Sequence, residues 1–299
     1  MKKYSVRPAR SSDIEAVHEV IAKQNIVDFG NALRTLADLQ KLWESIDLDN
    51  DTCIAFTDGK LAGYAELRDN DSPFIYLADR NNVDLAYQLL TILEDKAVSR
   101  KKETVNLFTQ ISENNKTLLQ LFAANGYKSN ISFLIMELVL SEAPTPPQWP
   151  AGITVRPFVK DQDEQATYET DEEASKDKGY HEPLSYDGWV KRMGMDKESF
   201  DPSLWFLACA GSEVTSVALN VFAKELNTGW VDHLSVKQAW RKRGIGKALL
   251  LHSFTEFYQR GIQHIKLSVD SKSLTNAPRL YESIGMKTVQ QYHIYRKEI

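Results

Sequence analysis

The chain has 299 residues, of which 42% are hydrophobic and 26% are charged. This composition is ordinary for globular proteins and excludes a largely disordered chain, a collagen-like chain and a coiled-coil rod. Lysine and arginine number 36 against 41 aspartate and glutamate residues, so the formal net charge of −5 argues against nucleic-acid binding over a broad surface.

The two cysteines, Cys53 and Cys209, lie far apart and have no second cysteine or histidine at metal-ligand spacing. We therefore expect neither a disulfide framework nor a bound metal. The N-terminus lacks the apolar run of a secretion signal, and no stretch approaches the roughly 20 apolar residues that a membrane span needs. These features predict a soluble, cytoplasmic protein without a membrane partner.

Taken in chain order, the first half opens with a strand-like segment at residues 4–8, which an acidic, helix-like stretch follows. The same order recurs from residue 153, where Ile-Thr-Val-Arg-Pro matches the earlier Tyr-Ser-Val-Arg-Pro. Residues 121–127 and 280–286 form a second matched pair near the ends of the two halves. Similar segments in the same order at a nearly constant offset predict a duplicated domain, with about ten residues inserted in the second copy.

Between the copies, four of the ten prolines fall within residues 141–150. Proline blocks both helix and ladder hydrogen bonds, so this segment is predicted to be an extended linker. The expected organisation is a first domain at residues 1–140, a linker at 141–151 and a second domain at 152–299, each domain of ordinary size.

The second half alternates strand-like and helix-like segments. Strands are predicted at residues 153–158, 204–210, 214–222, 229–236, 265–269 and 286–296, and helices at 161–177 (helical or irregular), 184–195, 246–259 and 275–284. An antiparallel meander that leads into a β-α-β-α-β unit predicts an α/β fold, in which a mixed sheet carries helices on both faces.

The most informative stretch lies between the strand at 229–236 and the helix at 246–259. The first N–H groups of a helix have no intrahelical partner, and the helix dipole adds positive charge there. Gly244 and Gly246 remove Cβ atoms, so a diphosphate could approach the backbone. Basic residues surround this turn: Arg241, Lys242, Arg243 and Lys247. Rossmann and P-loop spacings do not fit, and a plain glycine turn with solvated basic residues remains the alternative.

The pattern Arg241-x-x-Gly244-x-Gly246 resembles the R/Q-x-x-G-x-G/A signature of the GNAT acetyltransferase superfamily. Residues 234–236 before it and 276–286 after it also match that family in order and spacing. The resemblance covers the second half, about 150 residues. It implies two tandem GNAT-like acyl-CoA N-acyltransferase domains, in a plan similar to mycothiol synthase-like proteins.

The resemblance also implies acetyl-CoA as co-substrate. Backbone groups of Leu234, Ser235 and Val236 would bind its pantetheine arm and polarise the thioester carbonyl. The turn would hold its pyrophosphate through Arg241, Lys242, Arg243, Gly244, Ile245, Gly246 and Lys247. Ser273 and Ala277 are the last two residues expected to bind the co-substrate. Ser273 stands where the family often has asparagine.

For catalysis, the resemblance implies direct attack by the acceptor within a ternary complex. Tyr281 matches the tyrosine that protonates the departing thiolate. Asp232 lies on the strand before the turn, where family members often place a carboxylate or histidine. We expect either Asp232 or a water chain to act as the base, although a solvated Asp232 paired with a basic side chain fits the sequence equally well.

The first half departs from the family. Residues 78–86, where the turn should be, contain no glycine and place Asp79 and Asp84 where a diphosphate would lie. Phe122 replaces the tyrosine. We therefore predict a degenerate domain that keeps the fold but lacks the CoA turn and does not bind CoA in the usual way.

The acceptor pocket is expected between the first helices and the splayed strands of the second half. An acidic run there is either a solvated helix face or a guide for a cationic amine; it comprises Asp161, Asp163, Glu164, Glu169, Asp171, Glu172, Glu173 and Asp177. Aromatic residues could wall the pocket or fill the core: Tyr168, Tyr180, Trp189, Trp205 and Trp230.

The sequence thus predicts acetyl transfer to a primary amine of a small molecule. A non-catalytic acyl-CoA sensor and a peptide or protein acetyltransferase are the alternatives. The choice between a monomer and a homodimer stays open.

Overall fold

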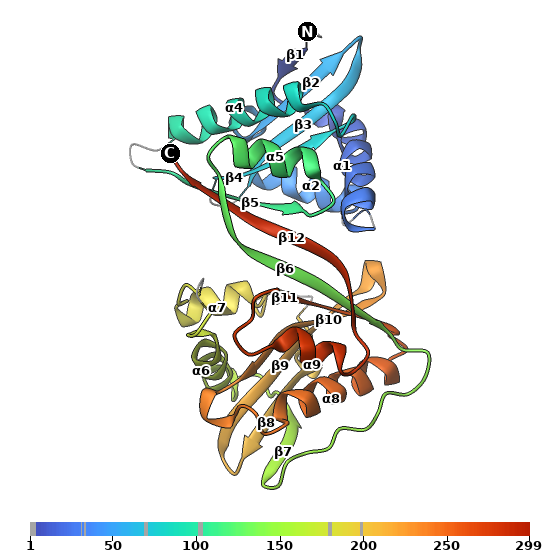
Figure 1. Ribbon diagram of the computed structural model, residues 1–299, viewed down its shortest axis with the longest axis vertical. Coiled ribbons are helices and arrows are strands. Elements are labelled where there is room, and N and C mark those ends of the chain that lie inside the picture. Colours follow the sequence, from blue (N-terminus) through green and yellow to red (C-terminus); the bar gives the residue numbers. More distant parts are fainter. Residues whose placement is uncertain are drawn as a thin grey trace. The chain divides into compact units, whose positions relative to one another are not determined.

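The computed structural model describes residues 4–30, 32, 34–68, 71–100, 104–178, 181–197 and 200–299. Contacts divide the chain into two compact units: unit 1 comprises Met1–Phe133 with Gln290–Ile299, and unit 2 comprises Leu134–Val289. The sequence places the divisions elsewhere, at residues 140 and 152. The proline-rich segment lies within unit 2, and the last ten residues return to unit 1 (Figure 1).

Unit 1 has an antiparallel sheet in the order β1-β2-β3-β4. Its elements are β1 (Ser5–Arg7), η1 (Ser11–Asp13), α1 (Ile14–Phe29), α2 (Leu36–Ser45), α3 (Leu48–Asp51), β2 (Thr52–Thr57), β3 (Lys60–Arg68), β4 (Ser72–Leu77), α4 (Val83–Arg100), β5 (Asn106–Ser112) and α5 (Lys116–Ala124). Strand β5 pairs antiparallel with the end of the last strand of the chain, β12 (Lys287–Glu298).

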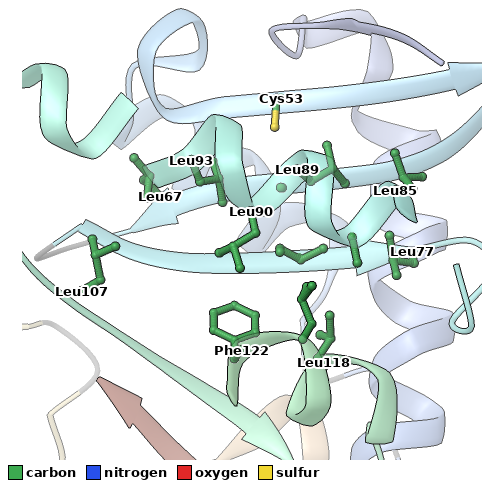
Figure 2. Packing of buried hydrophobic residues seen from close by; sticks show 14 of the residues in the cluster. Cys53, Leu67, Leu77, Leu85, Leu89, Leu90, Leu93, Leu107, Leu118 and Phe122 are labelled. Atoms are coloured by element: carbon green, nitrogen blue, oxygen red, sulfur yellow. The ribbon is translucent and has the colours of Figure 1, made fainter. Parts of the chain in front are cut away.

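Leucines of α4 build the core of unit 1. Leu85, Leu89 and Leu93 recur every four residues, so they share one face of the helix and are fully buried against the sheet. Figure 2 shows this row between Cys53 of β2 and the α5 side chains. Cys53 is a free, buried thiol whose pKa is raised to about 12 by burial, and it packs as a small apolar residue.

Unit 2 contains a mixed sheet in the order β6-β11-β10-β9-β8-β7. Its elements are β6 (Lys128–Val139, which begins in unit 1), β7 (Ile153–Pro157), α6 (Glu164–Ser175), α7 (Tyr186–Arg192), η3 (Pro202–Leu204), β8 (Trp205–Ala210), β9 (Glu213–Ala223), η4 (Lys224–Leu226), β10 (Thr228–Val236), η5 (Gln238–Trp240), α8 (Ile245–Gln259), β11 (His264–Asp270) and α9 (Ala277–Glu282). The predicted α/β fold with a mixed sheet is confirmed.

Helices cover both faces of this sheet because its side chains alternate. On β8, Trp205 and Leu207 belong to the core beneath α6 and α7, whereas Phe206 and Ala208 pack with α8. The predicted apolar face of α8 is fully buried, including Phe254 and Phe257. The sheet therefore separates an α6–α7 side from an α8 side.

The two units repeat one local device, which supports the predicted duplication. In unit 1, Arg7 forms a two-pronged ion pair with Asp13, at N–O distances of 2.7 and 2.8 Å. In unit 2, Arg156 pairs with Asp163 in the same way, at 2.6 and 2.7 Å. In each unit the pair ties the first strand to the start of the first long helix.

No helix in the described part of the chain is both long and apolar enough to cross a membrane. The described residues also contain no cluster of three or more histidine, cysteine or acidic side chains that could hold a metal ion.

Candidate functional site

Strands β10 and β11 separate part-way along their length. Their parallel pairing runs from Thr228–His264 to Val231–Leu267 and then stops, whereas β10 continues beside β9 as far as Val236. A bulge between Val231 and His233 marks the point of separation. One edge of β10 beyond Val231 therefore has no ladder partner from β11. Leu234, Ser235 and Val236 belong to this part of β10.

The turn after β10 leaves a row of backbone N–H groups without protein partners. Across the described residues, none of the N–H groups from Lys242 to Lys247 forms a hydrogen bond, and the first bond of α8 runs from Ala248 N–H to the Gly244 carbonyl. Gly244 caps the helix with a φ of +88°, a conformation that favours glycine. Lys242 is also left-handed, with a φ of +60°.

Open space lies next to these N–H groups. A Cβ atom on Gly244 would meet nothing within 4 Å, and one on Gly246 would touch only the Val236 side chain, at 3.5 Å. Lys242, Arg243 and Lys247 are exposed around this space, and Arg243 lies over the Trp240 ring at 4.6 Å. Ile245 contributes only its backbone, because its side chain is buried in the core.

Arg241 has a different role from the other basic residues. Its guanidinium is ion-paired with Asp177 and donates hydrogen bonds to the carbonyls of Val236 and Ala174, each at 3.0 Å. It therefore braces the turn against the end of α6. Unit 1 repeats this brace, because Arg80 after β4 is ion-paired with Asp28 near the end of α1.

Asp171 gathers a buried polar cluster on the α6–α7 side of β10. Its carboxylate is 3% exposed and lies 2.8–2.9 Å from Nδ1 of His233. It also accepts hydrogen bonds from the Ser235 hydroxyl at 2.7 Å and the Trp189 indole at 2.9 Å. The sequence pattern does not indicate this cluster, because Asp171 and His233 are 62 residues apart.

The cluster perturbs the ionisation of both its acid and its base. Burial raises the pKa of Asp171, but His233, Ser235 and Trp189 outweigh burial and hold it well below its usual range. Burial lowers the pKa of His233, whereas the Asp171 carboxylate raises it, and the net shift is upward. Because ionised Asp171 accepts the Nδ1 proton, the neutral imidazole carries its lone pair on Nε2.

The remaining predicted site residues belong to β10, to α9 and to the segment before α9. Asp232 is exposed at the bulge. Tyr281 of α9 is buried, and burial raises its pKa to about 12, so its hydroxyl stays protonated at neutral pH. Ala277 is the first residue of α9. Ser273 precedes that helix, with its hydroxyl 3.0 Å from the Thr275 hydroxyl.

The acidic run is largely engaged with protein partners. Asp163, Asp171 and Asp177 pair with Arg156, His233 and Arg241 respectively. Trp189 and Trp205 fill the core under α6 and α7. Tyr180 lies outside the described residues.

In unit 1, protein side chains form hydrogen bonds at the strand edge and at the helix start that have no such partners in the described part of unit 2. The Gln24 amide of α1 accepts a hydrogen bond from Leu77 N–H at 3.0 Å and donates one to the Ile75 carbonyl at 3.1 Å. The Gln24 side chain therefore occupies part of the open edge of β4. At the start of α4, the Asn82 side chain accepts a hydrogen bond from Leu85 N–H at 3.1 Å. Among the described residues of unit 1, side chains thus engage part of the β4 edge and the start of α4.

Comparison with known proteins identifies the family. Residues 163–286 match the Acetyltransferase (GNAT) family. A GCN5-related N-acetyltransferase from Sphaerobacter thermophilus superposes with a TM-score of 0.83 and is 30% identical, over 99% of this chain and 95% of that one. The chain belongs to the GNAT acetyltransferase family. Members of this family are acetyltransferases that generally use acetyl-CoA.

Other known proteins match about half of this GNAT chain or share its fold. It is 28% identical over 159 residues to a mycothiol acetyltransferase of Streptomyces scabiei and 29% identical over 156 residues to one of Thermobispora bispora. These matches cover 52% and 50% of this chain, and the chain spans about half the length of these curated relatives. A tandem GNAT protein from the clavulanic acid biosynthesis pathway shares the fold over 99% of this chain and 98% of that one, with a TM-score of 0.69 at 11% identity.

We predict that Gly246→Leu weakens acetyl-CoA binding at least about tenfold, a change of ~1.4 kcal/mol. The new side chain would fill the open space beside the bare N–H groups, whereas its Cβ meets the protein only at ordinary contact distance. Titration calorimetry measures the affinity, and the wild type is expected to bind one acetyl-CoA per chain. Ser212→Leu, which adds the same side chain at an exposed turn, is the control. Equal affinity of Gly246→Leu and the wild type would contradict the prediction that this turn binds acetyl-CoA.

Proposed function

We propose that unit 2 transfers an acetyl group from acetyl-CoA to a primary amine of a small molecule, by direct attack within a ternary complex. The observation that carries this proposal is the row of partnerless N–H groups from Lys242 to Lys247 at the start of α8. Family membership supports acetyl transfer. The buried Asp171–His233 pair supports a catalytic rather than a sensing role, because such pairs orient a base.

The residues of the turn fit a bound diphosphate. The free N–H groups, the left-handed Gly244 and the exposed Lys242, Arg243 and Lys247 together form an anion-binding helix start. Arg241 would hold the turn in place rather than contact the diphosphate, because its guanidinium is ion-paired with Asp177. Acetyl-CoA would supply a thioester whose carbonyl carbon is the electrophile. The free edge of β10 at Leu234–Val236 offers backbone donors to orient it, and Ser273 and Ala277 lie near the start of α9.

For the base, we favour His233 over the sequence-predicted Asp232. His233 is held by a buried carboxylate that fixes which ring nitrogen accepts a proton. Asp232 lies exposed at the bulge, and no hydrogen bond or ion pair to it is found among the described residues. In this proposal the Nε2 atom of His233 accepts the amine proton, and Asp171 is a positioning residue.

Tyr281 would supply the proton to the leaving thiolate. Burial raises its hydroxyl pKa to about 12, so Tyr281 carries the proton at neutral pH. The proposed small-molecule acceptor is supported by the two mycothiol acetyltransferases to which the chain is similar.

Replacing Tyr281 with phenylalanine should lower kcat about 100-fold or more, because the proton donor is lost. The dissociation constant for acetyl-CoA should change less than about twofold, since the ring and its packing remain. Turnover of a panel of small primary amines, followed by mass spectrometry, and calorimetric titration give the two quantities. Tyr258→Phe, in the same core cluster, is the matched control. An unchanged kcat would remove Tyr281 from the mechanism.

The pH dependence should report His233. A base must be neutral, so kcat/KM is expected to rise with pH through a midpoint above the ordinary histidine value of 6.5. Asp171→Asn removes the charge that stabilises the imidazolium, while burial remains, so the midpoint should move to lower pH and the rate should fall. Asp232→Asn should keep activity and move the midpoint less. Loss of activity in Asp232→Asn with an unmoved midpoint in Asp171→Asn would favour Asp232 as the base.

A further inference from the structure

Unit 1 contains a cavity that the chemistry of unit 2 does not use. It has a volume of about 170 Å³ and is lined by side chains of α1, β4, β5 and α5, together with Arg34 and Arg68. Strands β4 and β5 belong to different sheets, so no ladder hydrogen bonds close the gap between them. On the adjacent edge of β4, the Gln24 side chain engages the Leu77 N–H and the Ile75 carbonyl.

Positive charge exceeds negative charge at one end of this cavity. Among the residues that the structure describes, Arg34 and Arg68 lie there with one fully buried carboxylate, Glu66. Glu66 forms its close ion pair with Arg68 and accepts a hydrogen bond from the Tyr64 hydroxyl at 2.6 Å. Its distance to Nη1 of Arg34 is 3.7 Å, beyond hydrogen-bond range.

Arg34 therefore lacks a hydrogen bond to the Glu66 carboxylate. Its Nη1 atom is buried, and across the described residues it has no hydrogen bond. Arg68, in contrast, is held on three sides, because it also donates to the Tyr76 hydroxyl and stacks over the Phe74 ring at 3.7 Å. A buried guanidinium nitrogen without an acceptor is unfavourable, so this end of the cavity is suited to an anion.

Other charges lining the cavity are already compensated. Asp28 is ion-paired with Arg80 and accepts a hydrogen bond from Asn115 at 3.1 Å. The remaining wall is part polar and part aromatic and includes Thr109, Phe29 and Phe122. The space therefore combines one cationic end with a mixed, largely uncharged body.

We propose that this cavity binds a small organic carboxylate. The planar carboxylate pairs with the guanidinium of Arg34, and the body of the molecule lies against Phe29, Phe74 and Phe122. A guanidinium fork matches a carboxylate in two hydrogen bonds, and a cavity of this volume holds a molecule of amino-acid size rather than a nucleotide. The proposal stands independently of acetyl transfer in unit 2.

Matched acid and amide probes test the proposal on the full chain. Acetate, butyrate, 4-methylpentanoate and phenylacetate are titrated calorimetrically beside their neutral amides. At least one acid should bind saturably at one site, and its amide should bind at least about tenfold more weakly because the charge is lost. Acetyl-CoA should not compete with it, and inorganic phosphate should compete poorly because it lacks the apolar body.

Two variants locate the binding. Arg34→Gln should weaken the acid at least about tenfold, whereas Arg296→Gln, an exposed arginine, should leave it unchanged. Arg34→Lys keeps the charge without the fork and should give an intermediate affinity, which separates lost recognition from misfolding. The proposal is overturned if no acid binds saturably, if acid and amide bind equally, if phosphate binds as well as the acid, or if Arg34→Gln binds like the wild type.

Discussion

The site in unit 2 depends on backbone N–H groups that the protein itself leaves without acceptors. A side chain that caps a helix start stabilises the fold by about 0.5–2 kcal/mol, so folded chains usually have such a cap. In the described part of the chain, no side chain caps the start of α8, and Gly244 and Gly246 keep the adjoining space open. The first unit shows the alternative, because the Asn82 side chain caps the start of α4. One duplicated fold thus has an open and a closed version of the same helix start.

The arginine of the turn has a structural role that the duplication exposes. Arg241 joins the turn to Asp177, and Arg80 joins the equivalent part of unit 1 to Asp28. The brace is present even in the unit whose turn has no glycine. It therefore positions the loop after the strand, and the bare N–H groups are a separate addition found in unit 2.

The sequence predicts local features well because they depend on neighbours along the chain. Gly244 and Gly246, the apolar face of α8 and most strands of unit 2 are where the pattern places them. The helices predicted at 275–284 and 184–195 are shorter, at Ala277–Glu282 and Tyr186–Arg192. Pro278 at the start of the first and the Ser185 cap of the second set where these helices begin.

Features that depend on distant residues could not be predicted. The Asp171–His233 pair needs the packing of α6 on β10, and Asp171 reads in the sequence as one more acid in an acidic run. The engagement of Arg241 likewise depends on a carboxylate 64 residues away. The unit boundaries fall inside the long strands β6 and β12, where continuous strand pattern gives no sign of a division, whereas the prolines mark only a connection within unit 2.

A structure of the chain with acetyl-CoA tests the central claim most directly. The pyrophosphate oxygens are expected to accept hydrogen bonds from N–H groups between Lys242 and Lys247, with the loop conformation around Gly244 kept. A pyrophosphate bound elsewhere on the chain, or a rearranged turn whose N–H groups donate to protein oxygens, would contradict the account.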